Sequence, residues 1–209
     1  TDNEKSLTDY YALAIGAGIG YESPVIHHFQ FGLTGFFIFN INSSDLSKLD
    51  PLTKTGGRYE VGLFDLTNPS NKNDLDRLED LFIRYKFRKS KIEFGRFELN
   101  TPFINRQDGR MRGTIEEGIW GEWNEWKMVK IEGGWIRRIS PRSTVKWYDV
   151  ADSYGIYPSG INEYGMKSDY AGYTKSTGIG IIGLTIQPKA NLKIQWWNQF
   201  AENVFNTSM

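Results

Sequence analysis

The stretch FGRFELNTPFINRQDGRMRGTIEEGIW, residues 94–120, decides how the fold is interpreted. Both of its ends alternate apolar residues with polar or small ones, which is typical of β-strands. The segment between them, residues 100–114, contains three arginines, one aspartate and the apolar run Pro102-Phe103-Ile104. A tight hairpin needs only about two to five linking residues. A long, charged and partly apolar connection between neighbouring strands therefore needs an explanation.

Alternation with a period of two extends over most of the chain, while helical periodicity is nearly absent. The segment 73–82 is interpreted as the end of a loop, with at most one helical turn, that runs into a strand. The segment 178–187 is apolar without a clear phase. About eight strands are predicted, near residues 11–21, 29–41, 81–88, 91–97, 119–124, 131–135, 178–187 and 192–197.

The connections between these strands alternate between short and long. Short turns are expected at 23–24, 89–90, 127–129 and 188–191, and long loops at 42–76, 100–114 and 140–173. In an antiparallel sheet this order places the short turns at one end and the long loops at the other. Transmembrane β-barrels of the outer membrane have this asymmetry. Because every backbone polar group must be paired inside a bilayer, such a sheet has to close.

The composition agrees with a barrel and argues against a nucleic-acid-binding protein, a disulfide framework and a transmembrane helix. The chain has 209 residues with 25 basic and 25 acidic side chains, so nothing favours a nucleic-acid partner. Aromatic residues make up 15% of the chain, there is no cysteine, and no apolar run is long enough for a transmembrane helix. A soluble antiparallel sandwich or ligand-carrying barrel also alternates, and it stays open as an alternative.

The predicted fold class is all-β, an antiparallel transmembrane β-barrel in which residues 1–209 form a single domain. With four short turns and three long loops, both chain ends are expected at the long-loop end of the sheet. Complete bacterial barrels have both ends in the periplasm, so we expect the chain to be an incomplete segment of a larger barrel. The competing interpretation is a closed eight-stranded barrel with a filled interior.

Two groups of charged residues are candidate site residues. If the apolar face touches lipid, Arg84, Lys86 and Arg88 form a row on the lumen side that attracts anions, unless they are ordinary solvated residues. The long loop adds Arg106, Asp108, Arg110 and Arg112, followed by Glu116. Its Phe103 and Ile104 suggest a loop that folds inward and narrows the lumen. An ion-paired surface loop is the alternative.

Enzyme motifs are weak, and we expect no enzyme activity, no cofactor and no metal site. The two histidines, His27 and His28, are adjacent and so point to opposite faces of a strand. The run 178–183 fits the glycine pattern of a dinucleotide site, but no helix follows it.

The stretch GRFELNTPFINRQDGRMRGTIEEGIW resembles the OprD-like family of outer-membrane porins, in its Bacteroidetes-type form. The resemblance implies a monomeric or trimeric barrel of about eighteen strands that passes small solutes passively across the outer membrane of a Gram-negative bacterium. It also implies that the loop at 100–114 bends into the pore and that Arg96 joins the basic row. The alternative function is a non-transporting scaffold or accessory subunit of an envelope complex. The implied partners are small solutes, outer-membrane lipid and a homo-oligomer or membrane-protein complex.

Overall fold

The computed structural model describes residues 7–106, 111–156, 162–166 and 173–209. Over these ranges the chain forms one antiparallel sheet of ten strands and two one-turn helices. The strands are β1 (Ala12–Glu22), β2 (Phe29–Ser43), β3 (Arg77–Phe87), β4 (Ser90–Phe97), β5 (Ile115–Trp126), β6 (Val129–Ser140), β7 (Tyr148–Asp149), β8 (Ile179–Lys189), β9 (Leu192–Ala201) and β10 (Phe205–Ser208). The helices are α1 (Arg58–Val61) and α2 (Val150–Ser153).

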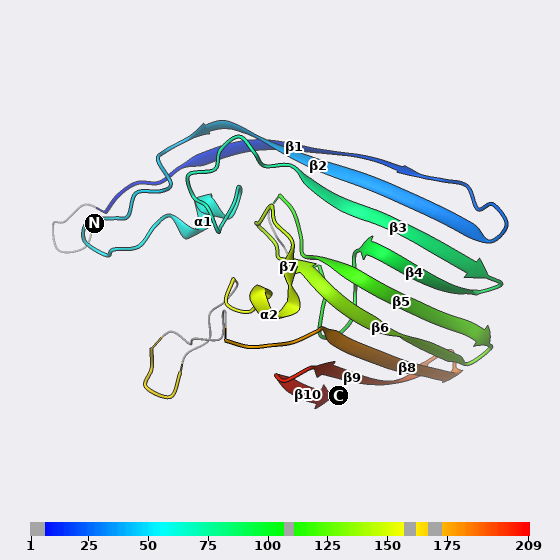
Figure 1. Cartoon of the computed structure of the whole chain (residues 1–209). Coiled ribbons are helices and arrows are strands. Elements are labelled where there is room, and N and C mark those ends of the chain that lie inside the picture. Colours follow the sequence, from blue (N-terminus) through cyan, green and yellow to red (C-terminus); the bar gives the residue numbers. More distant parts are fainter. Residues whose placement is uncertain (1–6, 107–110, 157–161, 167–172) are drawn as a thin grey trace.

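The sheet is a continuous meander that curls but does not close. Its order is β1-β2-β3-β4-β5-β6-β8-β9-β10, and β7 pairs with the end of β6 beyond β8. The tight turns lie at one end of the strands, and the segments that carry α1, β7 and α2 lie at the other (Figure 1). No helix in the described ranges is long and apolar enough to cross a membrane.

The eight long strands confirm the predicted strands, and the two short ones were not anticipated. Strand β3 begins at Arg77, so the segment interpreted as the end of a loop already belongs to the sheet there. Strands β9 and β10 are joined by residues 202–204 at the end where the long loops lie. Short connections are therefore not confined to one end of the sheet, as the sequence had suggested.

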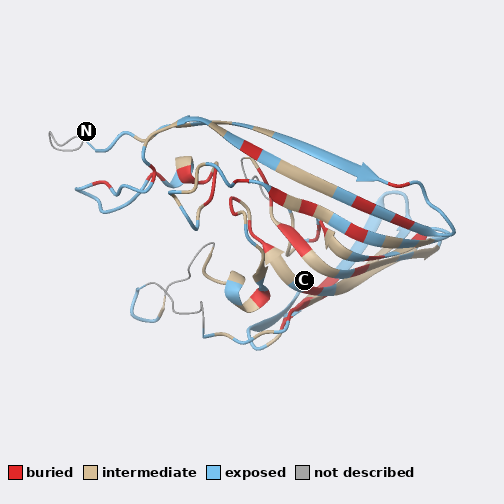
Figure 2. Cartoon of the chain, turned by 45° about the horizontal axis from the view of Figure 1, so that its top comes forward, coloured by how far each residue is buried: buried red, intermediate tan, exposed pale blue. Residues whose placement is uncertain are grey.

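Exposure alternates along the strands and divides the sheet into two faces (Figure 2). On what we call the outer face, large apolar side chains are uncovered: Phe31 is 51% exposed and Phe94 67% exposed. The opposite, inner face carries buried residues such as Phe82, Glu93 and Trp120. Soluble monomers rarely expose an apolar patch that runs across a whole sheet. The soluble sandwich is therefore wrong, because that fold would have buried this face.

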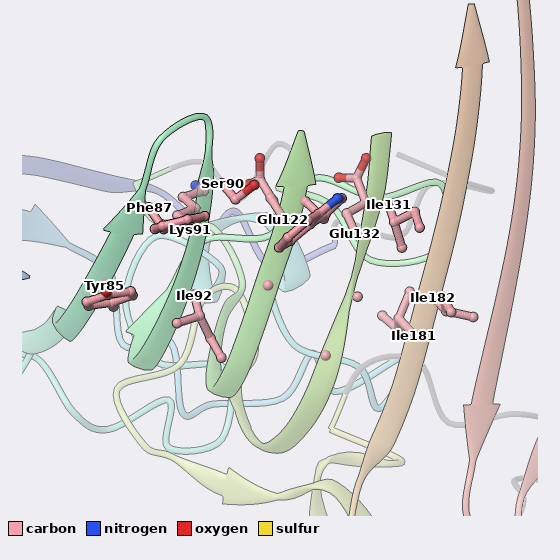
Figure 3. A pocket seen from close by; sticks show the side chains of 14 residues that line it. Tyr85, Phe87, Ser90, Lys91, Ile92, Glu122, Ile131, Glu132, Ile181 and Ile182 are labelled. Atoms are coloured by element: carbon pink, nitrogen blue, oxygen red, sulfur yellow. Dashed lines mark ion pairs between the residues drawn. The ribbon is translucent and has the colours of Figure 1, made fainter. Parts of the chain in front are cut away.

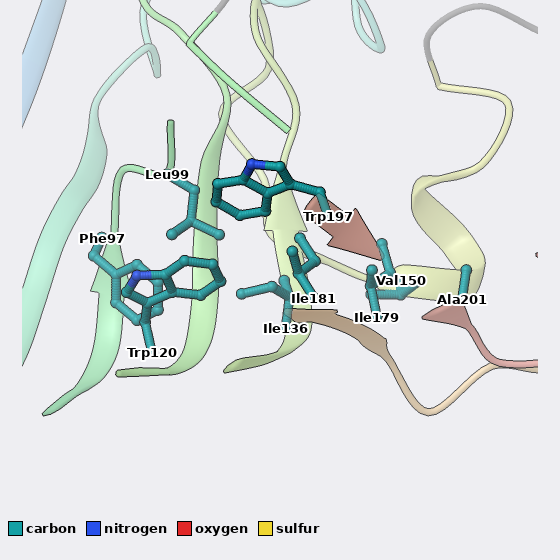
Figure 4. Packing of buried hydrophobic residues seen from close by; sticks show 9 residues of the cluster. All are labelled: Phe97, Leu99, Trp120, Ile136, Val150, Ile179, Ile181, Trp197 and Ala201. Atoms are coloured by element: carbon teal, nitrogen blue, oxygen red, sulfur yellow. The ribbon is translucent and has the colours of Figure 1, made fainter. Parts of the chain in front are cut away.

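The inner face carries two apolar clusters at the loop end. The first joins strands β4, β5, β6, β8 and β9 with α2 (Figure 4). Its members are Phe97, Leu99, Trp120, Ile136, Val150, Ile179, Ile181, Trp197 and Ala201. The second joins Ile38 of β2 to Leu46, Val61, Phe64 and Leu75 of the segment 44–76. Burial of Ile179 and Ile181, with Ile182 exposed, fixes the phase of β8 that the sequence left open.

Strand β4 continues through Gly95 and Arg96 without a bulge. Strand β4 pairs with β3 and β5 without a register shift, as in Phe94 with Ile119 and Arg96 with Glu117. The backbone strain is taken up at Gly95, whose φ is +127°, a conformation that side chains disfavour. A Cβ there would lie 2.1 Å from the carbonyl oxygen of Leu81.

Replacing Gly95 by alanine should lower the free energy of unfolding by about 1–3 kcal/mol or more, because both the φ angle and the contact with Leu81 become unfavourable. Gly121→Ala is the matched control, since the nearest atom to its Cβ lies 3.8 Å away. Denaturant unfolding of the native protein in lipid vesicles measures both variants. Equal stability of the two variants would contradict the assignment of strain to Gly95.

Candidate functional site on the inner face

Arg84 of β3 is the centre of a first charged network on the inner face. Its Nη1 lies 2.9 Å from Glu22 Oε1, and its Nε lies 2.5 Å from Glu93 Oε2. Its Nη1 also donates to Gln30 Oε1 at 3.0 Å, and its guanidinium lies 4.2 Å from the centre of the Phe82 ring. Arg84 is thus neutralised by two carboxylates, Glu22 at the end of β1 and Glu93 of the adjacent strand β4.

A second network continues across β4, β5 and β6. Lys91 Nζ lies 2.9 Å from Glu122 Oε1, and Lys130 Nζ lies 3.4 Å from Glu122 Oε2. Lys130 Nζ also lies 3.0 Å from Glu132 Oε2. Because opposite residues of paired strands share a face, the pairings Lys91 with Glu122 and Glu122 with Glu132 place these charges in one row across the sheet.

Both networks line a cavity of about 510 Å³ on the inner wall. Its wall also includes the aromatic rings of Phe82, Phe97 and Trp120. The carboxylates that line it are Glu22, Asp80, Glu93, Glu98, Glu122 and Glu132, and the cations are Arg84, Lys91 and Lys130. Carboxylates outnumber cations two to one, so this wall is not the bare row of cations that the sequence suggested.

Two members of the predicted basic row do not lie on the inner wall. Arg88 is in the turn between β3 and β4, with a φ of +49° and its guanidinium 5.1 Å from the centre of the Phe87 ring. Arg96 is opposite Leu81 on the outer face, where its Nε donates to Glu117 Oε2 at 2.8 Å. The predicted pore-lining positions of Arg88 and Arg96 were wrong, whereas the register places Arg84 and Lys86 on the inner face.

The loop between β4 and β5 contacts the inner side of the sheet at two separate places. Phe103 and Ile104 pack against the first apolar cluster, and they line one pocket together with its member Ile179. Met111 packs against the second cluster and lies against Gly16 of β1, where an added Cβ would come within 2.7 Å of its Cε. Of the predicted constriction residues, Arg106 is exposed and pairs with Glu98 at 2.9 Å. Asp108 and Arg110 lie outside the described residues.

Arg112 and Glu116 are buried and therefore cannot contact a passing solute in this conformation. Arg112 is 2% exposed and donates to the carbonyl oxygens of Leu75 and Thr144. Burial lowers its pKa to about 10, so it remains protonated at neutral pH. Glu116 is 1% exposed and accepts a hydrogen bond from the Leu99 backbone N–H at 3.1 Å. Their predicted role as exposed constriction charges was wrong, because they hold loops together instead.

A family model described as outer membrane porin, OprD family, matches residues 41–208. The chain belongs to this family. Three similar solved structures are porins: OccD3 (OpdP) and OccK9 (OpdG) of Pseudomonas aeruginosa, and OccAB4 of Acinetobacter baumannii. No match was found among curated proteins.

The comparison with these three structures shows that the chain has a similar fold. The TM-scores are 0.65 for OccD3, 0.68 for OccK9 and 0.63 for OccAB4, with sequence identities of 18%, 16% and 16%. The matches cover 94%, 93% and 99% of this chain, but 38%, 44% and 49% of the other chains. The chain thus spans less than half the length of these porins. Its open antiparallel sheet matches the β-barrel fold of these porins of the Gram-negative outer membrane.

In this porin, a buried arginine that joins loop segments to the inner wall was not identified from the sequence. Arg77 is 3% exposed and donates to Glu79 Oε1 at 2.7 Å, Gly113 O at 2.7 Å and Ser140 Oγ at 3.1 Å. It joins the start of β3 to the segments on both sides of the β5–β6 hairpin. Arg77 lies in the segment 73–82, which the sequence indicated to be the end of a loop that runs into a strand.

The described residues contain no group of three or more His, Cys, Asp or Glu side chains placed to hold a metal ion. The inner face presents paired charges and aromatic rings. OprD-family members are transport channels, and these groups can contact a solute without reacting with it.

Proposed function

We propose that the protein containing this chain is a passive channel for small charged solutes, narrowed by the loop at 100–114. The observation that carries the proposal is the double anchoring of this loop. Phe103 and Ile104 pack on one side of the inner face, and Met111 packs on the side formed by β1 and β2. A loop held at both places extends across the inner side of the sheet.

We propose charged solutes because the cavity on the inner face is lined by charges of both signs. The cavity is lined by twice as many carboxylates as cations, so the wall gives a cationic group more partners than an anionic one. Fields from such walls raise the local concentration of oppositely charged solutes. A similar structure, P. aeruginosa OpdK, 15% identical to this chain, contains vanillate. That ligand is a small aromatic carboxylate, which supports a solute of that size here.

Conductance of the full-length native protein in a planar bilayer tests the proposal. We expect steady single-channel currents, and a severalfold larger conductance in the double variant Phe103→Ala/Met111→Ala, because the loop loses both apolar anchors. Met166→Ala is the control, since Met166 is an exposed methionine of another loop and should leave the conductance unchanged.

Absence of current from correctly folded native protein would overturn the proposal in favour of a scaffold or accessory subunit. An unchanged conductance in the double variant would remove the narrowing role from the loop while leaving the channel itself in place.

A further inference from the structure

The outer face contains a notch where two glycines lie side by side. Ile92 of β4, Gly121 of β5, Gly133 of β6 and Ile182 of β8 are paired in one row across four strands. Since the two central positions have no side chain, the surface is hollow between the flanking isoleucines. The resulting cavity has a volume of about 570 Å³ and a largely apolar lining (Figure 3).

The notch extends to the turn that joins β3 and β4. Its lining includes Tyr85, Phe87, Trp123 and, at the first position of β4, Ser90. The Ser90 hydroxyl donates to Glu125 Oε1 at 2.7 Å, and the residue is buried. The small Ser90 side chain, held by Glu125, therefore fills little of the notch at this end.

Exposed cations lie in the two turns next to this end of the notch. Arg88 and Lys89 form the β3–β4 turn, and Lys127 lies in the neighbouring β5–β6 turn. The carboxylate beside them, Glu125, accepts hydrogen bonds from the Lys89 backbone N–H at 3.0 Å and from Ser90. Lys91, Glu122 and Glu132, which also line the notch, pair with one another or with Lys130. Beside this network, Arg88, Lys89 and Lys127 outnumber Glu125, which leaves an excess of positive charge where the apolar notch meets the polar turns. The ring centres of Trp123 and Trp126 are 6.2 Å apart, and both exposed side chains lie near the end of β5, beside the same turns.

We propose that this notch binds one anionic phospholipid, with an acyl chain over Gly121 and Gly133 and the phosphate group near Arg88, Lys89 and Lys127. The outer face of an outer-membrane barrel touches lipid, and its short turns lie on the periplasmic side, where the leaflet consists of phospholipid. Basic residues beside a membrane surface attract anionic lipids, and tryptophans occupy the same interfacial level. An apolar notch with a cationic mouth matches both ends of such a molecule.

The test is competitive lipid retention by the full-length native protein in detergent, measured by native mass spectrometry with phosphatidylglycerol and phosphatidylcholine of identical acyl chains. We expect phosphatidylglycerol to be retained more strongly by at least about fivefold, the effect of a single well-placed cation. The variant Arg88→Gln/Lys89→Gln should lose most of this preference. Gly121→Leu, which fills the notch, should weaken retention of both lipids alike.

Lys54→Gln/Lys175→Gln is the charge-matched control, because both lysines lie in loops at the other end of the strands. It should retain the native preference. Equal retention of the two lipids by the native protein would overturn the proposal, and so would an equal loss of preference in the control variant. The result does not depend on conduction, so a barrel without current could still show the site.

Discussion

Replacing Arg77 by alanine should lower the free energy of unfolding by about 3–5 kcal/mol, the effect expected when one partner of a buried ion pair is removed. The substitution leaves Glu79 without its cation, and it removes the donors to Gly113 O and Ser140 Oγ. Denaturant unfolding of the native protein in lipid vesicles measures the loss. Protease cleavage within residues 100–114 should accelerate in parallel, because Gly113 is no longer held.

Two comparisons make this prediction specific. The double variant Arg77→Met/Glu79→Leu should be less destabilised than Arg77→Ala, because no unpaired charge stays buried. Arg106→Ala should change stability by less than about 1 kcal/mol, since its pair with Glu98 is exposed to water. If Arg77→Ala proved as mild as Arg106→Ala, Arg77 could not be the residue that ties the loops to the wall.

Placing an arginine at Leu33 should destabilise the barrel by about 2–4 kcal/mol, the measured cost of a cation on the lipid face near mid-depth. Leu33 lies on the outer face, five residues into β2, between Tyr21 of β1 and Leu81 of β3. All three side chains are exposed, so an arginine there would have lipid as its surroundings. Unfolding titrations in vesicles report the cost.

The neighbouring position provides the matched control. Thr34 lies on the inner face opposite Asp80, so Thr34→Arg gains a carboxylate partner and should cost less than about 1 kcal/mol. Similar losses of stability in Leu33→Arg and Thr34→Arg would mean that lipid and water do not cover opposite faces of the sheet.

The faces of the strands could be predicted from the sequence because they depend on local alternation. Phe31 and Ile83 share the face that their spacing implied, and Arg84 lies on the opposite one. The inward contacts of Phe103 were also suggested by sequence, since a solvated loop has no use for such a side chain. Both inferences need only the identity of nearby residues and the cost of placing apolar groups in water.

Most of the individual site residues could not be predicted, because their surroundings come from distant segments. Arg112 is buried by Leu75 and Thr144, which lie more than thirty residues away on either side of it. The charge of Arg84 is cancelled by Glu22 and Glu93 only once strands β1, β3 and β4 lie together. Arg96 lies on the outer face because β4 pairs with β3 without a register shift, which places Arg96 opposite Leu81.

The central claim is that lipid covers the outer face and water the inner face. The chain has no cysteine, so single cysteines can be placed in turn at residues 29–41 of β2 in the full-length native protein. In vesicles, a membrane-impermeant maleimide should label half-buried inner positions such as 34 and 40, but not position 38, which the second apolar cluster covers. A lipid-phase quencher should reach probes at the odd-numbered positions. Labelling without a two-residue period, or with the opposite phase, would contradict the claim.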